Sequence, residues 1–215
     1  MTRNYDAFTL AEVLITLVIV GVIASMTIPT LMNNTNKQEY ASRLKKAYST
    51  LSQATNRIIT EQGNPKASIG GWATSHQAVY DMYIKYLSKA KECGVTKNKG
   101  CFSGTYKRMD NTLANYETAN RYAFVLADGT EVLVREEHSS DCSHIGSGSM
   151  DTCQYLCVDI NGAKGPNAIG KDTFMFVLKN NGLFPAGCDY DGDCSLSSYG
   201  WGCTCKVIRE GAMNY

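Results

Sequence analysis

The chain has 215 residues, with 21 basic and 20 acidic side chains and a formal net charge of +1. Because the basic and acidic side chains nearly cancel, the chain has no overall electrostatic field that would attract nucleic acid. Its length suits one domain or slightly more. All nine cysteines lie from Cys93 onward. This distribution favours maturation of the C-terminal two-thirds in an oxidising compartment, outside the cytoplasm.

The first predicted element is a long helix over about residues 8–60. Its first half carries no charge between Glu12 and Lys37, and residues 13–32 would span about 30 Å as a helix, the thickness of a bilayer's hydrocarbon core. Pro29 is expected to kink it. In the second half, apolar residues recur at steps of three and four, typical of an amphipathic helix that carries a globular head: Tyr40, Leu44, Ala47, Tyr48, Leu51, Ala54 and Ile58.

A cleaved secretory signal is the alternative interpretation of the apolar segment. The stretch VIAS, ending at Ser25, has the small residues that such a cleavage site requires. However, the apolar run continues through Ile28 and Leu31, and the helical pattern extends well beyond it. We therefore favour a transmembrane helix.

Glu12 lies at the start of the apolar run. A carboxylate at the centre of a membrane helix costs roughly 2.5–3.5 kcal/mol on insertion scales, and less near an end, so Glu12 either snorkels to the interface or marks a functional site. The short polar leader, the sequence AFTLAEVLITLVIVGVIA and then Pro29 resemble the N-terminus of type IV pilins and of the pseudopilins of type II secretion systems. The resemblance is strongest over about residues 7–60.

This resemblance implies a set of processing and assembly residues. A prepilin peptidase would cut between Ala7, where the family usually has glycine, and Phe8, and would methylate the new amine of Phe8. Glu12 would be the assembly carboxylate, meeting the Phe8 amine of a neighbouring subunit, and Pro29 the family's kink. The implied organisation is a leader over 1–7, a transmembrane and assembly half over 8–34, and a pilin-like head over 35–215.

The head is predicted to combine one more helix with an antiparallel sheet, which gives an α+β fold with the sheet packed on the amphipathic half of the long helix. The second helix is expected over 75–91. The sequence RYAFVLADGTEVLVRE predicts a hairpin that turns at Asp128-Gly129. Further strands are predicted from YLCVDI, TFMFVL and GLF.

Two groups of acidic and amide side chains are candidate calcium ligands. Asp159, Asn161 and Asp172 supply hard oxygens in a part of the head where some secretion pseudopilins bind Ca²⁺, although they also suit turns and caps. The sequence CDYDGDC holds the second group, Asp189, Asp191 and Asp193. Its glycine precedes the position that an EF-hand requires, and the alternative is an acidic surface loop closed by a disulfide.

The cysteines are expected to form disulfides, with Cys93–Cys101 and Cys188–Cys194 as the local pairs. Cys203 and Cys205 are too close to bridge one another comfortably, so each is expected to bond elsewhere. A zinc site is the less favoured alternative for Cys142, His144, Cys153 and Cys157, because the spacing is unusual and an exported domain favours disulfides.

The sequence therefore predicts a structural subunit of a type II secretion pseudopilus or a type IV pilus, not an enzyme, since no nucleophile–base motif is present. Its expected partners are other pilin subunits, the prepilin peptidase, an inner-membrane assembly platform and lipid. The expected location is the bacterial inner membrane, with the head outside the cytoplasm, and then a filament in the periplasm or at the cell surface. A tethered or secreted disulfide-rich binding or metal module that does not polymerise is the alternative.

The direction of insertion rests on two opposing signals. By the positive-inside rule, the basic residues that follow the apolar segment would keep the C-terminus in the cytoplasm: Lys37, Arg43, Lys45 and Lys46. The cysteines favour the opposite side, and large domains are translocated despite such charges. We follow the cysteines.

Overall fold

The computed structural model describes residues 8–62, 76–95, 100–102, 104–114, 121–136, 154–179, 181–188 and 194–215. The chain divides into two compact units, Met1–Glu39 and Tyr40–Tyr215. We call the second unit the head.

A single long helix, α1, spans Leu10–Gln62 and continues through Pro29. This confirms the long helix expected from the sequence. Within the head, Leu44, Leu51 and Ile58 are fully or almost fully buried, so the predicted apolar stripe is the face that packs into the core.

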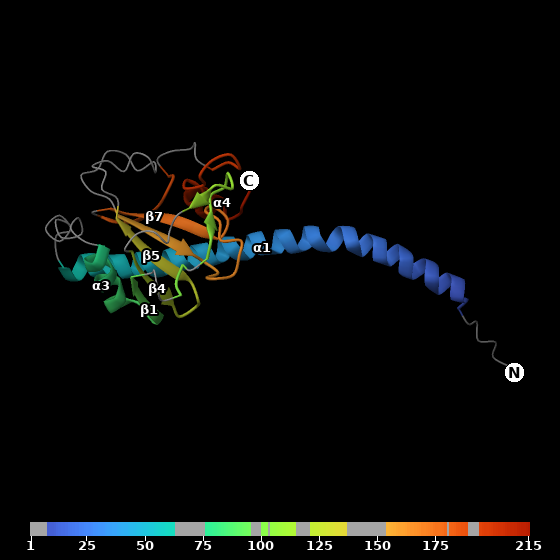
Figure 1. The fold of residues 1–215 in the computed structure, drawn as a ribbon, viewed down its shortest axis with the longest axis horizontal. Coiled ribbons are helices and arrows are strands. Elements are labelled where there is room, and N and C mark those ends of the chain that lie inside the picture. Colours follow the sequence, from blue (N-terminus) through green and yellow to red (C-terminus); the bar gives the residue numbers. More distant parts are fainter. Residues whose placement is uncertain are drawn as a thin grey trace. The chain divides into compact units, whose positions relative to one another are not determined.

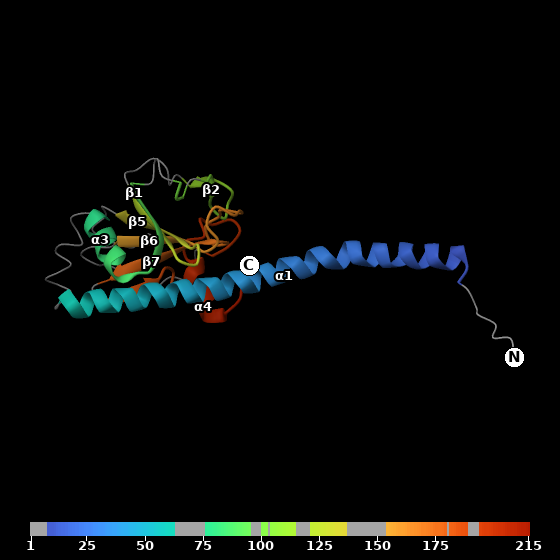
Figure 2. The ribbon, with the colours of Figure 1, turned by 90° about the horizontal axis from the view of Figure 1, so that it is seen from below.

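The sheet of the head has six antiparallel strands in the order β1-β4-β5-β6-β7-β8. Their bounds are Lys89–Val95, Tyr122–Leu126, Glu131–Glu136, Gln154–Asp159, Thr173–Lys179 and Gly182–Pro185. The hairpin of β4 and β5 turns at Asp128-Gly129 as predicted, with Gly129 at φ +86° and the Leu126 N–H donating to Thr130 O at 2.8 Å. Figures 1 and 2 show the head half of α1 lying along one face of this sheet.

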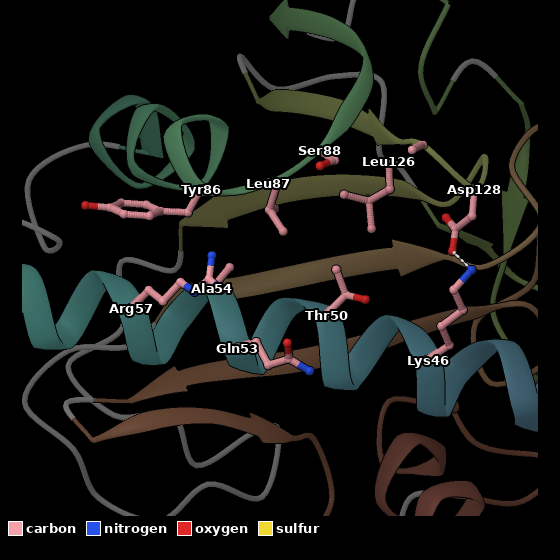
Figure 3. A pocket seen from close by; sticks show the side chains of 11 residues that line it. Lys46, Thr50, Gln53, Ala54, Arg57, Tyr86, Leu87, Ser88, Leu126 and Asp128 are labelled. Carbon is pink, nitrogen blue, oxygen red and sulfur yellow. Dashed lines mark ion pairs between the residues drawn. The ribbon is translucent and has the colours of Figure 1, made fainter.

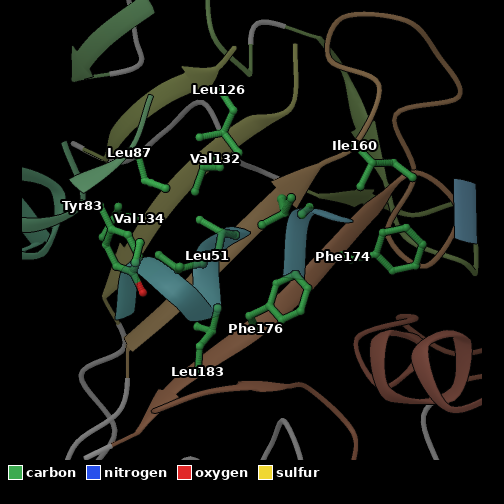
Figure 4. Close-up of a cluster of buried hydrophobic side chains, with 14 of the residues drawn as sticks. Leu51, Tyr83, Leu87, Leu126, Val132, Val134, Ile160, Phe174, Phe176 and Leu183 are labelled. Atoms are coloured by element: carbon green, nitrogen blue, oxygen red, sulfur yellow. The ribbon is translucent and has the colours of Figure 1, made fainter. Parts of the chain in front are cut away.

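Both faces of the sheet are buried, and alternate side chains of each central strand serve different cores. In β7, Phe174 and Phe176 belong to the cluster that packs on α1 (Figure 4), whereas Met175 and Val177 belong to a second cluster on the opposite face. The Phe176 ring stacks on Tyr48 of α1 at a centroid distance of 5.4 Å. The period of two in β7 thus divides one apolar run between two cores.

The second helix of the head, α3, is shorter than predicted. It spans His76–Tyr86, whereas the sequence pattern favoured a helix up to residue 91. Residues from Lys89 onward instead form β1, because they pair with β4 from Lys89–Leu126 to Val95–Tyr122. Tertiary pairing therefore overrides the local helical preference of the lysine- and alanine-rich segment.

Short elements complete the head around the sheet. The β2–β3 hairpin, Tyr106–Lys107 with Leu113–Ala114, lies on the side of the sheet away from α1 (Figure 2). A short helix, α4, spans Cys203–Glu210 and packs against β7 and β8. The residue before α4, Gly202, lies very close to Gly187. A Cβ on residue 187 would be 2.3 Å from the Cα of Gly202, so position 187 requires glycine.

The outer strands of the described sheet are β1 and β8. In β1 the pairing with β4 shifts twice, between Lys89 and Lys91 and between Glu92 and Gly94. In β8 the last residue is Pro185, which has no N–H to donate. Both outer strands are therefore irregular or interrupted.

Three disulfides join described cysteines. Cys93 is bonded to Cys101, the pair expected from the sequence. The expected Cys188–Cys194 pair is wrong, because Cys188 is bonded to Cys205 and Cys194 to Cys203. The reason is α4, whose first turn brings both of its cysteines to the segment that follows β8.

Candidate functional site

The N-terminal half of α1 exposes a long, mainly apolar surface without charged side chains from Val13 to Asn36. Its large apolar side chains between Val13 and Met32 are 46–71% exposed, and Phe8 is 87% exposed. An 18-residue stretch has a mean hydropathy of 2.3 with none of it buried, and α1 is the one described helix long and apolar enough to cross a membrane. Soluble monomers rarely expose apolar patches of more than a few hundred Å². Such a surface is consistent with a segment that lipid or other protein covers.

The hydroxyl groups within this apolar half are already satisfied by the helix. Thr16, Ser25, Thr27 and Thr35 each donate to a backbone carbonyl three or four residues earlier, at distances of 2.7–3.0 Å. In hydrocarbon, an unpaired hydroxyl is costly because no water is present to bond it. These internal hydrogen bonds make the polar residues compatible with an apolar surrounding.

Reciprocal hydrogen bonds close the N-terminus of α1. The Thr9 backbone N–H and the Thr9 hydroxyl both donate to Glu12 Oε2 at 2.8 Å. In return, the Glu12 N–H donates to Thr9 Oγ1 at 3.2 Å. This arrangement is a capping box, in which a threonine at the helix start and a glutamate three residues later satisfy each other's backbone donors. Glu12 thus has a partner within its own chain.

The capping box leaves part of Glu12 available. Both contacts use Oε2, and Oε1 accepts no hydrogen bond from the residues that the structure describes. The Thr9 N–H belongs to the peptide bond between Phe8 and Thr9, so a cut before Phe8 would not remove it. The capping box and a new N-terminal amine on Phe8 are therefore compatible.

Thr9 is the site residue that the sequence interpretation missed. Its signal was present, because the stretch Thr9-Leu10-Ala11-Glu12 has the spacing of a capping box directly before an apolar run. Of the other processing residues, Phe8 is described and exposed, whereas Ala7 lies outside the described residues.

The first group of candidate calcium ligands lies at the end of β6 and in the loop that follows. Asp159 is fully buried, and its Oδ2 accepts from the Tyr106 hydroxyl at 2.8 Å while its Oδ1 accepts from the Asn161 N–H at 3.1 Å. The Asn161 amide donates to Tyr40 Oη and to Gly165 O, each at 3.3 Å. These contacts tie the loop to β2 and to α1.

Asp172 closes the same loop from its other end. Its two oxygens accept from the backbone N–H groups of Asn167 and Ala168, both at 2.7 Å. In the part of the chain that the structure describes, no three or more His, Cys, Asp or Glu residues are placed to hold a metal ion. The arrangement fits a hydrogen-bonded turn better than a calcium site, and calcium at Asp159, Asn161 and Asp172 stays a prediction.

The other metal candidates are mostly outside the described residues. This holds for Asp189, Asp191 and Asp193, and for three of the four candidate zinc ligands, Cys142, His144 and Cys153. The fourth, Cys157, is buried in β6 within the second core.

Burial raises the pKa of the two carboxyl groups in this loop, those of Asp159 and Asp172. Burial, and then the negative charge of nearby Asp172, raise the pKa of Asp159 from 3.8 to about 8. Burial also raises the pKa of Asp172. Asp159 therefore holds its proton more tightly in the folded chain than in the unfolded chain.

We expect the stability of the head to fall as the pH rises. The contribution of protonated Asp159 is complete below pH 3.8 and is lost as the pH rises through about 8. Asp159→Asn is neutral at every pH, so it should flatten this decline by an amount on the order of a few kcal/mol. Chemical unfolding of the full chain in detergent, at pH values across this range, measures it.

The matched control is Asp110→Asn. Asp110 is a partly exposed carboxylate, and hydrogen bonds from Thr112 lower its pKa. Its removal should therefore leave the decline at rising pH in place. If the stability of the Asp159→Asn variant fell as steeply with rising pH as that of the unchanged chain, Asp159 would not be the source of the pH dependence.

Comparison with known proteins gives two matches that together cover most of the chain. Residues 30–203 match the model of a family of unknown function (DUF6613). Residues 2–28 match the prokaryotic N-terminal methylation motif, which is the prepilin-type cleavage and methylation segment of type IV pilins and pseudopilins. No curated protein and no solved structure matches the chain significantly.

Proposed function

Because the chain belongs to the family of unknown function DUF6613 and begins with a prepilin-type methylation segment, we propose that it is a structural filament subunit. In this proposal a prepilin peptidase cuts it between Ala7 and Phe8 and methylates the Phe8 amine. It then polymerises through α1. The chain is the substrate of a peptidase, not an enzyme.

The observation that carries this proposal is the exposed apolar half of α1 together with its closed polar start. A helix whose apolar side chains are about half to three-quarters exposed is stable in lipid or in a bundle of like helices. Transfer from one to the other leaves the apolar surface covered at every stage. A filament core built from copies of α1 replaces the lipid.

Glu12 supplies the register of that bundle. Cleavage creates a cationic amine on Phe8, and Glu12 Oε1 of a neighbouring subunit is a charge-matched acceptor for it. Each charge is unfavourable in an apolar surrounding, and the two neutralise each other only at one stagger of the helices. The capping bond from Thr9 holds the carboxylate in place for this contact.

The filament belongs, in this proposal, to the type II secretion pseudopilus or type IV pilus class. The subunit is inserted in the inner membrane with the head outside the cytoplasm, where disulfides form. An inner-membrane assembly platform then transfers it from lipid into the filament.

The test is the intact mass and the N-terminal peptide of the protein isolated from the membranes of its native host. We expect a chain that begins at Phe8 and carries one additional methyl group. The same chain should be found in filaments sheared from the cells or overproduced in the periplasm.

Other results would contradict the proposal in distinct ways. A chain that begins near Ser25 would be a secreted domain released from a signal peptide. An uncut chain that begins at Met1 would be a membrane-tethered module, and attention would then move to its disulfide-rich head.

A further inference from the structure

The head contains a groove of about 280 Å³ along α1, between the α3–β1 connection and the β4–β5 turn (Figure 3). Its floor is apolar, since Ala54, Leu87 and Leu126 line it and each is at most 9% exposed. An apolar floor with polar edges is the usual composition of a site that receives a side chain or a short peptide.

The edges of the groove are rich in cations and hydrogen-bond donors. At one end Lys46 pairs with Asp128 at 2.9 Å, and at the other end lies the exposed Arg57 (Figure 3). Thr50 and Gln53 line the wall between them. With two cations against one carboxylate, the groove suits an occupant that is acidic and carries an apolar or aromatic side chain.

Three large apolar side chains of the described head are exposed, on two segments of the chain that contact each other. They are Leu113, Leu196 and Tyr199, which are 50–64% exposed. Their two segments are joined by a hydrogen bond from the Asp110 N–H to Ser198 O at 3.0 Å, and Arg108 lies over the Tyr199 ring at 4.7 Å. We call Leu113, Leu196 and Tyr199 the apolar patch.

The apolar patch borders an acidic stretch of the sequence. Residues 189–193 read Asp-Tyr-Asp-Gly-Asp, between Cys188 and Cys194. Both flanking cysteines are bonded to α4, so the two ends of this stretch are anchored to the head. Anchored ends reduce the entropy that a segment loses on binding. The stretch has the charge and the aromatic side chain that the groove requires.

We propose that the groove of one subunit receives residues 189–193 of a second copy of this chain, an inference that rests on the proposed function. The Tyr190 ring lies on the apolar floor, and the aspartates of the stretch meet Lys46 and Arg57. Leu196 and Tyr199 of the second copy, which follow this stretch in the sequence, are covered in the same contact. No residue is shared by the two surfaces, so the contact is head-to-tail and can repeat from one copy to the next.

A charge exchange tests this contact in full-length protein expressed in its host. Arg57→Glu and Asp191→Lys, each alone, should lower the amount of subunit in the filament fraction by about tenfold or more, and the two together should restore it. Lys164→Glu is the matched control, since Lys164 is an exposed cation outside the groove. The processed mass and intact disulfides of each variant show that it folds.

A photo-crosslinking amino acid at Gln53, which lines the groove, identifies the occupant directly. We expect a covalent link to the peptide that contains residues 189–193 of another copy, and no such link from Ser42, which is outside the groove. A link to lipid, to a different protein or to another part of this chain would overturn the inference, as would a failure of the charge exchange to restore incorporation. Those results would leave the proposed function unaffected. If the unchanged chain formed no filament, both the proposed function and this inference would be disproved.

Discussion

Glu12→Ala is expected to leave cleavage before Phe8 unchanged and to remove the subunit from filaments. Breaking one partner of a desolvated ion pair costs roughly 3–5 kcal/mol, which corresponds to at least about a hundredfold loss of incorporation. The measurement compares the processed mass of the variant in membranes with its abundance in the filament fraction. Normal incorporation of Glu12→Ala would disprove the register role of Glu12.

The capping box makes a sharper control possible. Glu12 both caps its own helix through Thr9 and, in our proposal, pairs with a neighbouring amine. Glu12→Gln keeps an oxygen for the capping contact and removes the charge, whereas Thr9→Ala keeps the charge and removes the cap, at a cost of about 1 kcal/mol. If the charge sets the register, Glu12→Gln fails like Glu12→Ala and Thr9→Ala is only mildly impaired. The reverse order would assign Glu12 to the helix cap alone.

Removal of the Cys188–Cys205 disulfide should destabilise the head strongly. The bond closes a sequence separation of 17 residues and holds α4 against the end of β8. Loop-closure entropy for this separation is worth about 3 kcal/mol, so the Cys188→Ser, Cys205→Ser double variant should lose about that much free energy of unfolding. Denaturant unfolding without reductant measures the loss.

Peptide mapping of the unchanged chain tests the disulfide pairing on which that experiment depends. It should recover Cys188 linked to Cys205 and Cys194 linked to Cys203. A Cys188–Cys194 link would contradict the structure and return the local pairing expected from the sequence. The double variant should still contain the Cys194–Cys203 link, which shows that α4 remains attached.

Strong local patterns in the sequence were sufficient to predict much of this fold. The stripe through Leu44, Leu51 and Ile58 repeats at helical spacing over five turns, and the structure buries it as expected. The hairpin at Asp128-Gly129 was equally predictable, because its turn type requires a residue with positive φ. In both cases the signal lies within one continuous segment.

The errors concern elements that depend on distant partners. The helix α4 has only eight residues, which is too short to be stable alone, and disulfides and contacts with β7 and β8 hold it. The strand β1 exists because β4 pairs with it. The partners of Cys188 and Cys194 are the two cysteines of α4, so a sequence prediction without α4 also missed both disulfides.

The candidate site divides in the same way. Thr9 and Glu12 are three residues apart, and their contact was legible in the sequence. The contact between Tyr106 and Asp159 joins residues 53 positions apart, and burial in this contact raises the pKa of the Asp159 carboxyl to about 8. Sequence spacing alone does not distinguish these two roles of an aspartate.

The irregular outer strands have a consequence for the filament that we propose, in which many heads lie close together. Exposed edges of regular strands hydrogen-bond to one another and lead to cross-β fibrils, which are very stable and do not readily dissociate. In the described sheet, the two pairing shifts and the lysines of β1 and the Pro185 of β8 make such additions unfavourable at both edges. These features disfavour amyloid-type stacking of the heads, so that in our proposal the copies assemble through the apolar half of α1 and not through their sheets.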